Sequence, residues 1–573
     1  MLKRWIALLL AALMLLSLAA CGGKPEQAET AAVDVADAEE YNGELPFVKE
    51  GDEPITIKIG IHRLANVEDY KDNKFTKWLE EQTGLNIEFM LFNGSTAEAA
   101  TQVSLMIASG EKLPDILHPG GISKSQVNQY GKDGYFLDLA PYFEKYAYYQ
   151  KDAFAAFPDD NVRERAMALG EEPTSGAIYN FPFVSNSPLD NPICHAWINQ
   201  KWLDKLGLKM PTTLSELHDV LVAFRDQDPN GNGKKDELPI IGRADAAYID
   251  ILRPIINAYV YWNPLYSFNT DADGKLWLPF DKDEYRQALI YIKDLVDEGL
   301  LSTLTWTQSI EEEKGLLNPS EGEDYICGIV CGDANIHFTP NSPTVFDYEP
   351  LPPFKAETPL GGYAPLGDYN MRFNTFIAAD CEHPVEAFKL LDFLSSPEAI
   401  LRGRWGERGV NWEWSEGGKL GNLGGEAKIK LIGEPVFSTQ NNANWHSTRS
   451  TFSEYDSQYE IDTTDENSWE AVRVKKYLKN YENYIAAGQP ERVVTYLNYE
   501  DEANERMTEI AKEFTSFVKD RRAQFCTGVL DPRNDAQWQE YLDGLQALHM
   551  DEYLALGQEA YDKQVEQMAA MKK

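Results

Sequence analysis

The chain opens with an alternation of strand and helix patterns that narrows its possible folds more than any other feature. Isoleucine at every second position over residues 55–61 predicts a strand, and residues 85–91 repeat the pattern with Leu, Ile and Phe. A helical pattern between them ends at Gly84, and a second one ends at Gly110. This order favours an α/β fold with a mostly parallel sheet, whose ligands bind beyond the carboxyl ends of the strands.

The length and the charge of the chain limit its organisation and its partners. Its 573 residues exceed what one hydrophobic core usually organises, so we expect two or more lobes. The formal net charge of −39 predicts an acidic surface, which repels nucleic acid and anionic lipid headgroups. We therefore expect no nucleic-acid partner and no membrane contact other than an anchor.

The N-terminus has the pattern of an export signal. Lys3 and Arg4 precede an apolar run over residues 5–20, about 24 Å long as a helix and short of a bilayer's hydrocarbon core of about 30 Å. Leu-Ala-Ala before Cys21 resembles a bacterial lipobox, which implies cleavage of residues 1–20, lipidation of Cys21 and attachment to the outer face of the cell membrane. An ordinary secretory signal beside a chance cysteine is the alternative. Residues 21–51 are polar and acidic and predict a flexible tether.

Five cysteines remain beyond Cys21, too few and too scattered for a disulfide framework. Because the number is odd, at least one thiol stays unpaired. Cys327 and Cys331 lie on one predicted buried strand, about 13 Å apart, so they cannot pair with each other. With Asp333 nearby they could bind a metal, but small buried side chains are the better interpretation.

Helical patterns recur to the end of the chain. Thr213 and Glu216 form a capping box, a helix is predicted over residues 284–298, and Pro384 begins another. Two more helices are predicted near the C-terminus, over residues 538–545 and 553–568.

Residues 228–239 have the spacing of a calcium-binding loop. Oxygen-bearing side chains at alternate positions converge on a hard cation, and Gly233 supplies the sharp turn. Pro239 stands where the standard loop has a bidentate glutamate, so the late carboxylates must come from earlier positions. A surface turn without metal is the alternative. The candidate ligands of a structural Ca²⁺ are Asp228, Asn230, Asn232, Lys234, Asp236 and Glu237.

Residues 197–239, together with blocks at 108–117, 296–302, 383–393 and 548–561, resemble the extracellular solute-binding proteins of bacterial ABC importers. The resemblance is to family 1, particularly the large lipoproteins related to lipoprotein LplA and the calcium-containing alginate-binding proteins. It implies a two-lobe periplasmic-binding-protein-like fold of type II that encloses a ligand. With chain crossings near 183–191 and 365–372, we expect lobe 1 at 52–187 plus 372–430, and lobe 2 at 188–371 plus 431–573 with C-terminal helices.

Sugar ligands would need flat aromatic faces and polar side chains at the strand ends. Four tryptophans lie between 405 and 445, although core packing is the commoner role of any single tryptophan. The remaining candidates follow predicted strands or lie near the crossings. The candidate ligand-binding residues are His62, Arg63, Asp115, Trp262, Trp306, Asp333, Tyr369, Trp405, Trp412, Trp414 and Trp445.

We therefore predict a monomeric, non-enzymatic protein that captures a neutral or mildly charged oligosaccharide and delivers it to an ABC permease. Peptide or another nutrient is an alternative ligand. A secreted polysaccharide hydrolase with two carboxylates, or a sensor or adhesion subunit, is an alternative function. The sequence contains no Gly-x-Ser-x-Gly, His-Glu-x-x-His or Walker pattern, so esterase, metalloprotease and ATPase activities are disfavoured.

Overall fold

The computed structural model divides into two compact units. Unit 1 comprises Met1–Phe183, Met371–Asn411 and Glu434–Phe452, and unit 2 comprises Val184–Asn370, Trp412–Gly433 and Ser453–Lys573. The structure describes residue 35 and residues 38–571, except for 156–161, 173, 186–191, 193, 245–249, 265–267, 321–322, 333–337, 339–341, 343, 368–369, 423–424, 433–435, 437–439, 446–459, 463–466, 468, 495–496, 498 and 500. The predicted signal, lipobox and most of the predicted tether lie outside the described residues.

Unit 1 is built on a five-stranded sheet in the order β2-β1-β3-β11-β4. Strands β1 (Thr56–His62), β2 (Asn86–Phe92) and β3 (Ile116–His118) run parallel, and β11 (Asn370–Ile377) runs antiparallel to β3. Strand β4 (Phe181–Ser185) completes the sheet. Helices α2 (Lys74–Thr83) and α3 (Thr96–Ser109) connect the first three strands, each ending at a left-handed glycine, Gly84 or Gly110. The predicted β-α-β-α opening is confirmed.

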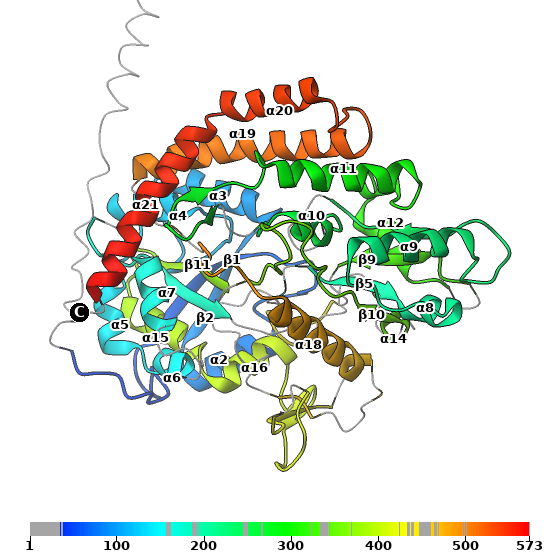
Figure 1. Ribbon diagram of the computed structural model, residues 1–573. Coiled ribbons are helices and arrows are strands. Elements are labelled where there is room, and N and C mark those ends of the chain that lie inside the picture. Colours follow the sequence, from blue (N-terminus) through cyan, green and yellow to red (C-terminus); the bar gives the residue numbers. More distant parts are fainter. Residues whose placement is uncertain are drawn as a thin grey trace, which may run out of the picture. The chain divides into compact units, whose positions relative to one another are not determined.

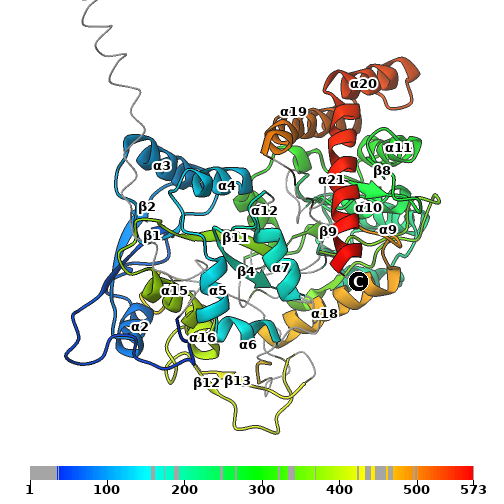
Figure 2. The same ribbon diagram turned by 90° about the vertical axis from the view of Figure 1, so that its left-hand side faces the viewer.

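Helices cover both faces of the unit 1 sheet. Figures 1 and 2 show α3 and α4 (Lys124–Lys132) on one side, with α2, α5 (Ala140–Tyr146) and α15 (Pro384–Phe393) on the other. The buried carboxylate of Asp392 in α15 accepts hydrogen bonds from three successive backbone N–H groups, those of residues 148–150, at 2.9–3.0 Å. These bonds attach α15 to the start of α6 (Tyr149–Ala155). Helices α7 (Val162–Gly170) and α16 (Pro397–Trp405) complete the unit.

Unit 2 contains a four-stranded sheet in the order β10-β5-β9-β6. Its strands are β5 (Ala196–Asn199), β6 (Leu238–Ile240), β9 (Cys327–Cys331) and β10 (Tyr348–Pro350). Strand β5 runs antiparallel to β9 and β10, and β6 runs parallel to β9. The carboxyl ends of β6, β9 and β10 therefore meet the amino end of β5 at one edge of the sheet.

Several of the helices of unit 2, but not all of them, lie where the sequence predicts them. Helix α9 (Leu214–Asp226) begins at the predicted capping box, and α11 spans Asp283–Asp297. The C-terminal helices are α19 (Asp501–Cys526), α20 (Asp535–Ala547) and α21 (Met550–Met571), and Figure 1 shows α11, α19 and α20 stacked side by side. The smaller elements are α8 (Gln200–Leu206), α10 (Arg253–Tyr259), β7 (Asn269–Thr270), β8 (Leu276–Trp277), η1 (Thr303–Trp306), α12 (Ile310–Leu317), α14 (Thr344–Asp347), β12 (Trp412–Trp414), β13 (Ile429–Leu431) and α18 (Trp469–Ala487).

The segment Trp412–Gly433 belongs to unit 2 and is linked to another segment of that unit by a β-bridge. Strand β12 pairs with β13, and Ile429 forms an isolated bridge with Ile461. Among the described residues, no helix is both long enough and apolar enough to cross a bilayer.

Candidate binding site

Two histidines and one arginine lie at the carboxyl edge of the parallel strands in the unit 1 sheet. His62 and His118 end β1 and β3, and Ile61 lies opposite His118 in the parallel pairing. Antiparallel β11 brings Arg372 to the same edge, where its guanidinium lies 5.6 Å from the ring centre of Phe183. This edge combines hydrogen-bond donors with an aromatic face, which are the groups that bind a polar ligand with apolar patches.

His118 is held in its neutral form by its surroundings. Its pKa is lowered to about 4, first by burial and then by the nearby charges of Arg372 and His62. Its Nδ1 lies 2.7 Å from the hydroxyl oxygen of Thr375 on β11. At neutral pH the imidazole can therefore donate at one nitrogen and accept at the other, which suits a hydroxyl group.

The acid titration of His118 gives a first prediction. Between pH 6.5 and 4 the unfolded chain binds a proton at this histidine while the folded chain does not, so folding stability falls as the pH falls, by up to about 1.4 kcal/mol per pH unit. His118→Gln removes this contribution. Urea unfolding of both proteins from pH 7 to 4.5 should show wild type losing more stability than the variant. A constant difference in unfolding free energy across that range would contradict the prediction.

The candidate ligand-binding residues predicted near the strands of unit 1 lie at opposite ends of the sheet. The side chain of His62 contacts the carbonyl oxygen of Gly94 at 2.8 Å, and Arg63 is exposed directly after β1. Asp115 precedes β3 and accepts a hydrogen bond from the backbone N–H of Lys58 at 2.8 Å. Asp115 therefore lies at the amino end of β3, while His62 and Arg63 lie at the carboxyl end of its parallel neighbour β1.

Unit 2 has a buried charged cluster near the corresponding edge of its sheet. Asp250 forms ion pairs with Arg522 at 2.8 Å and with Arg253 at 3.5 Å. Both guanidinium groups also lie over the ring of Trp262. The guanidinium carbon of Arg253 is 4.8 Å from the ring centre, and that of Arg522 is 5.0 Å from it. The predicted ligand residue Trp262 is therefore half-buried and held in contact with two cations.

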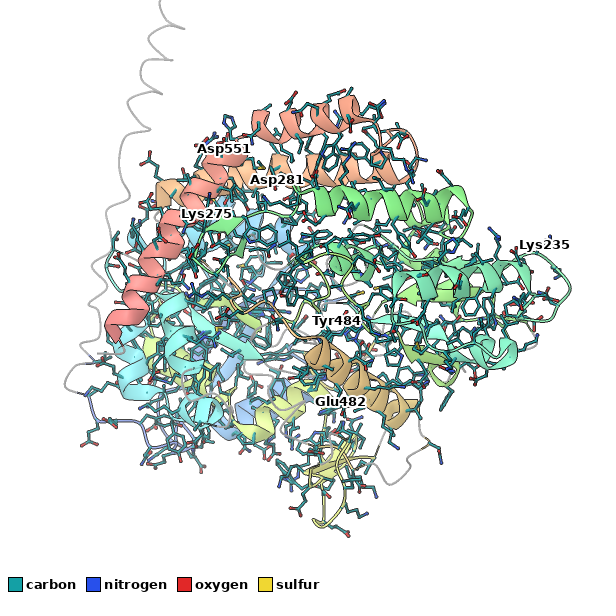
Figure 3. All side chains as sticks on the ribbon, in the orientation of Figure 1. Lys235, Lys275, Asp281, Glu482, Tyr484 and Asp551 are labelled. Atoms are coloured by element: carbon teal, nitrogen blue, oxygen red, sulfur yellow. The ribbon has the colours of Figure 1, made fainter. Side chains whose placement is uncertain are left out.

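A small pocket adjoins this cluster within unit 2. Arg253 and Asn257 of α10 line it together with Tyr363 and with Tyr484 of α18, which Figure 3 labels. Two nitrogens of the Arg253 guanidinium, Nε and Nη1, are buried without a hydrogen-bond partner among the described residues. The segment of residues 351–354 after β10 supplies apolar walls. Sequence reasoning missed Arg253 because its position depends on the fold around α10.

The predicted tryptophans occupy different environments. Trp445 is buried in unit 1, where its Nε1 donates to the hydroxyl of Thr76 at 2.8 Å. Trp412 is fully buried and contacts half-buried Trp414 edge to face at 5.3 Å. Trp405 is buried at the end of α16, and Trp306 is half-buried at the end of η1. Asp333 and Tyr369 lie outside the described residues.

The loop after α9, which holds the predicted calcium ligands, begins with a tight turn. Asp228 has a φ of 47°, and its carboxylate accepts hydrogen bonds from the N–H groups of Gly231 at 2.9 Å and Gly233 at 3.1 Å. Lys234 donates its backbone N–H to the side-chain oxygen of Asn232 at 2.8 Å. Figure 3 labels Lys235 in this loop, which extends beyond the end of α9.

The later part of the loop brings amide and carboxylate side chains together. Asn230 and Asn232 donate hydrogen bonds to the carboxylate of Asp236 at 3.1 and 3.2 Å. Burial raises the pKa of Glu237, as do the carboxylates of Asp236 and Asp228, and Glu237 Oε1 is buried without a hydrogen-bond partner among the described residues. Among all the described residues, no group of three or more His, Cys, Asp or Glu side chains is arranged so that it could hold a metal ion. The loop residues thus bond to one another.

Comparison with known proteins identifies the family. The model of the bacterial extracellular solute-binding proteins matches residues 65–400, more than half of the chain. The chain belongs to this family, and the predicted family resemblance and α/β fold class are confirmed. The fold also matches a solved HMO-binding, ABC-transporter-associated solute-binding protein from Bifidobacterium longum infantis, with a TM-score of 0.72 and 21% identity over 89% of this chain and 99% of that one.

Two curated relatives extend the comparison. The fructooligosaccharide ABC transporter substrate-binding protein FusA of Streptococcus pneumoniae is 24% identical over 85% of this chain and 86% of the relative. Lipoprotein LipO of Bacillus subtilis is 28% identical over 43% of this chain and 45% of the relative. A solved EF-hand mutant of FusA with fructo-nystose has a TM-score of 0.69 and 21% identity over 89% of this chain and 100% of that one.

Proposed function

We propose that this protein captures an oligosaccharide outside the cytoplasm and delivers it unchanged to the permease of an ABC importer. The observation that carries the proposal is the match with FusA along most of both chains, because FusA is named as a fructooligosaccharide-binding protein of such a transporter. The chain acts as a monomer, and the energy for transport comes from the transporter. Ligand capture requires that the ligand favour one conformation of the binding protein, which the permease then recognises.

The two sheet edges offer the chemistry that sugars require. In unit 1, we propose that His62, His118 and Arg372 form hydrogen bonds with ligand hydroxyl groups beside the ring of Phe183, which Arg372 contacts. In unit 2, the indole of Trp262 is fixed in place and can stack on a sugar ring. We also propose Arg63, Trp306 and Trp414 as ligand residues, because their side chains are exposed or half-buried. We propose Asp333 and Tyr369 because of their positions in the sequence.

We further propose that Cys21 carries the lipid anchor predicted from the lipobox. The similarity to lipoprotein LipO supports this proposal, although the match covers less than half of each chain. Two acyl chains would hold the protein stably at the membrane, where a single chain binds reversibly. Accumulation of the uncleaved precursor in the presence of globomycin would support the anchor, and unchanged processing would exclude it.

The loop over residues 228–237 is proposed to hold a structural Ca²⁺. Its donor set fits a hard cation, because all candidate side chains except that of Lys234 carry oxygen, and Lys234 would contribute its backbone carbonyl. The orphaned oxygen of Glu237 is a buried acceptor that a cation would satisfy. The side-chain amides of Asn230 and Asn232 already donate to the carboxylate of Asp236. Rotating each amide group by half a turn would exchange its nitrogen for its oxygen, so that the oxygen would lie beside Asp236 and could bind the cation. The description of a FusA variant as an EF-hand mutant supports the same assignment.

The proposed function is tested by thermal unfolding of the purified chain against a panel of fructo-, galacto- and uronic-acid oligosaccharides. A ligand that binds only the folded state at 100 times its Kd stabilises it by about 2.7 kcal/mol, so one class should raise the unfolding temperature by several degrees. A peptide pool is the matched control and should leave the temperature unchanged. A shift with peptides alone would reject the carbohydrate assignment.

A further inference from the structure

Two of the buried cysteines of unit 2 face each other. The sulfur atoms of Cys194 and Cys331 lie 2.7 Å apart, and both side chains are at most 1% exposed. Cys194 lies two residues before the start of β5, and Cys331 is the last residue of β9. The two residues are separated by 137 positions in the sequence, so only the folded sheet brings them together.

The strand register explains the contact. In the antiparallel pairing of β5 with β9, Ala196 lies opposite Cys331. Side chains two residues apart on extended backbone point to the same face, so Cys194 shares the face of Ala196 and Cys331. All three belong to the same hydrophobic core. The sulfur atoms therefore meet diagonally across the end of the strand pair.

Two separate thiols do not fit this contact. Even carbon atoms that are not bonded keep about 3.5–4.0 Å between them, and sulfur is larger than carbon. A bonded pair of sulfur atoms is about 2.05 Å apart, so a small side-chain adjustment converts the contact into a bond. We propose that Cys194 and Cys331 form a disulfide bond in the mature protein.

The other cysteines of the described chain differ from this pair. The sulfur of Cys327, at the opposite end of β9, lies 3.7 Å from the carbonyl oxygen of Leu316. Cys381 lies beside Asp115, and Cys526 lies near Arg522 and Asp250. No sulfur–sulfur contact is observed for these three among the described residues. The disulfide therefore leaves an odd set of buried thiols, as the odd number of cysteines requires.

The compartment permits the reaction. Members of an extracellular family work where disulfides form and persist. The oxidant is itself a disulfide, of an exported thiol–disulfide oxidoreductase or a small molecule. One thiolate of the pair attacks it to give a mixed disulfide, and the second thiolate then displaces the oxidant's sulfur. The protein loses two protons and two electrons, and the oxidant leaves as two thiols.

The burial of the pair sets the order of events. Burial raises the pKa of Cys331, so its reactive thiolate is scarce once unit 2 has folded. Oxidation therefore precedes or accompanies the packing of β5 against β9. After folding, the same burial excludes reductants from the bond.

The bond would fix the edge of the sheet that carries the proposed ligand residues of unit 2. Beside it, the N–H of Gly332 donates to the carbonyl oxygen of His195 at 2.9 Å. The hydroxyl of Tyr484, a residue of the pocket wall, donates to the carbonyl oxygen of Cys194 at 2.8 Å. A covalent link between β5 and β9 therefore holds the strand end and the pocket wall in one arrangement.

Peptide mapping tests the bond directly. The full-length protein is purified without reductant, denatured in the presence of iodoacetamide and digested without reduction. We expect mass spectrometry to find the peptides of Cys194 and Cys331 linked, and those of Cys327, Cys381 and Cys526 alkylated. Alkylation of both Cys194 and Cys331, or a link from either to another cysteine, would overturn the proposal.

A stability measurement provides a second test, with Cys327→Ala as the matched control on the same strand. Closing a loop of this length restricts the unfolded chain, so reduction before refolding should lower the wild-type unfolding temperature by roughly 5–10 °C. The same treatment should lower that of Cys327→Ala equally and leave the Cys194→Ala, Cys331→Ala double variant unchanged. Equal sensitivity of the double variant, or insensitivity of wild type, would overturn the proposal.

Discussion

Asp236→Asn is expected to lower the thermal unfolding temperature by about 4 °C when the protein is measured in millimolar calcium. The variant removes the carboxylate on which Asn230 and Asn232 converge. A cation bound at 100 times its Kd contributes about 2.7 kcal/mol to folding, and a unit of roughly 330 residues changes its unfolding temperature by about 1.4 °C per kcal/mol. Differential scanning calorimetry with calcium and with chelator measures the effect.

The control for this experiment is Asp226→Asn, which neutralises an exposed carboxylate at the end of α9, outside the loop. The control should retain the response of wild type to calcium, whereas Asp236→Asn should lose it. If wild type unfolds at the same temperature in calcium and in chelator, the segment is a hydrogen-bonded surface turn and the metal assignment is wrong.

Trp445→Ala is expected to destabilise unit 1 by about 3–5 kcal/mol, the usual cost of truncating a buried tryptophan. Its indole packs edge to face on Phe75 and Phe89, at 5.0 and 5.4 Å, and donates a hydrogen bond to the buried hydroxyl of Thr76. The substitution leaves a cavity and removes one of the two hydrogen bonds of the Thr76 hydroxyl, which still donates to the carbonyl oxygen of Tyr70 at 2.6 Å. Urea unfolding should report this loss, while oligosaccharide affinity per folded molecule stays unchanged.

Trp414→Ala is the matched variant, because this residue is half-buried and lies on the short β12–β13 hairpin. We expect a smaller loss of stability there and a loss of oligosaccharide affinity. If Trp445→Ala weakened binding with little change in unfolding, the assignment of Trp445 to the core would be wrong.

Patterns with local causes were readable in the sequence. The alternating isoleucines of β1, the capping box of α9 and the limits of α11 depend on residues close together in the chain, and the structure confirms them. The spacing of residues 228–237 identified the loop in the same way. Each of these patterns follows from backbone periodicity or from a local hydrogen bond.

Features made by distant segments were not readable. Arg372 reaches the edge beside His118 because β11 adds antiparallel to β3, more than 200 positions away in the chain. Trp445 looked like a candidate for sugar stacking until its partners from α2 and β2 showed it to be a core residue. The grouping of residues 412–433 with unit 2, where the sequence suggested lobe 1 up to residue 430, depends on a bridge to Ile461.

Isothermal titration of the purified chain with the oligosaccharide class that raises its unfolding temperature, followed by chromatography of the recovered sugar, tests the central claim most directly. The account predicts saturable binding of one oligosaccharide per chain and recovery of the sugar at its original length. Shortened sugars would identify a hydrolase, and the absence of binding by any oligosaccharide would contradict the assignment as a carbohydrate-capturing protein.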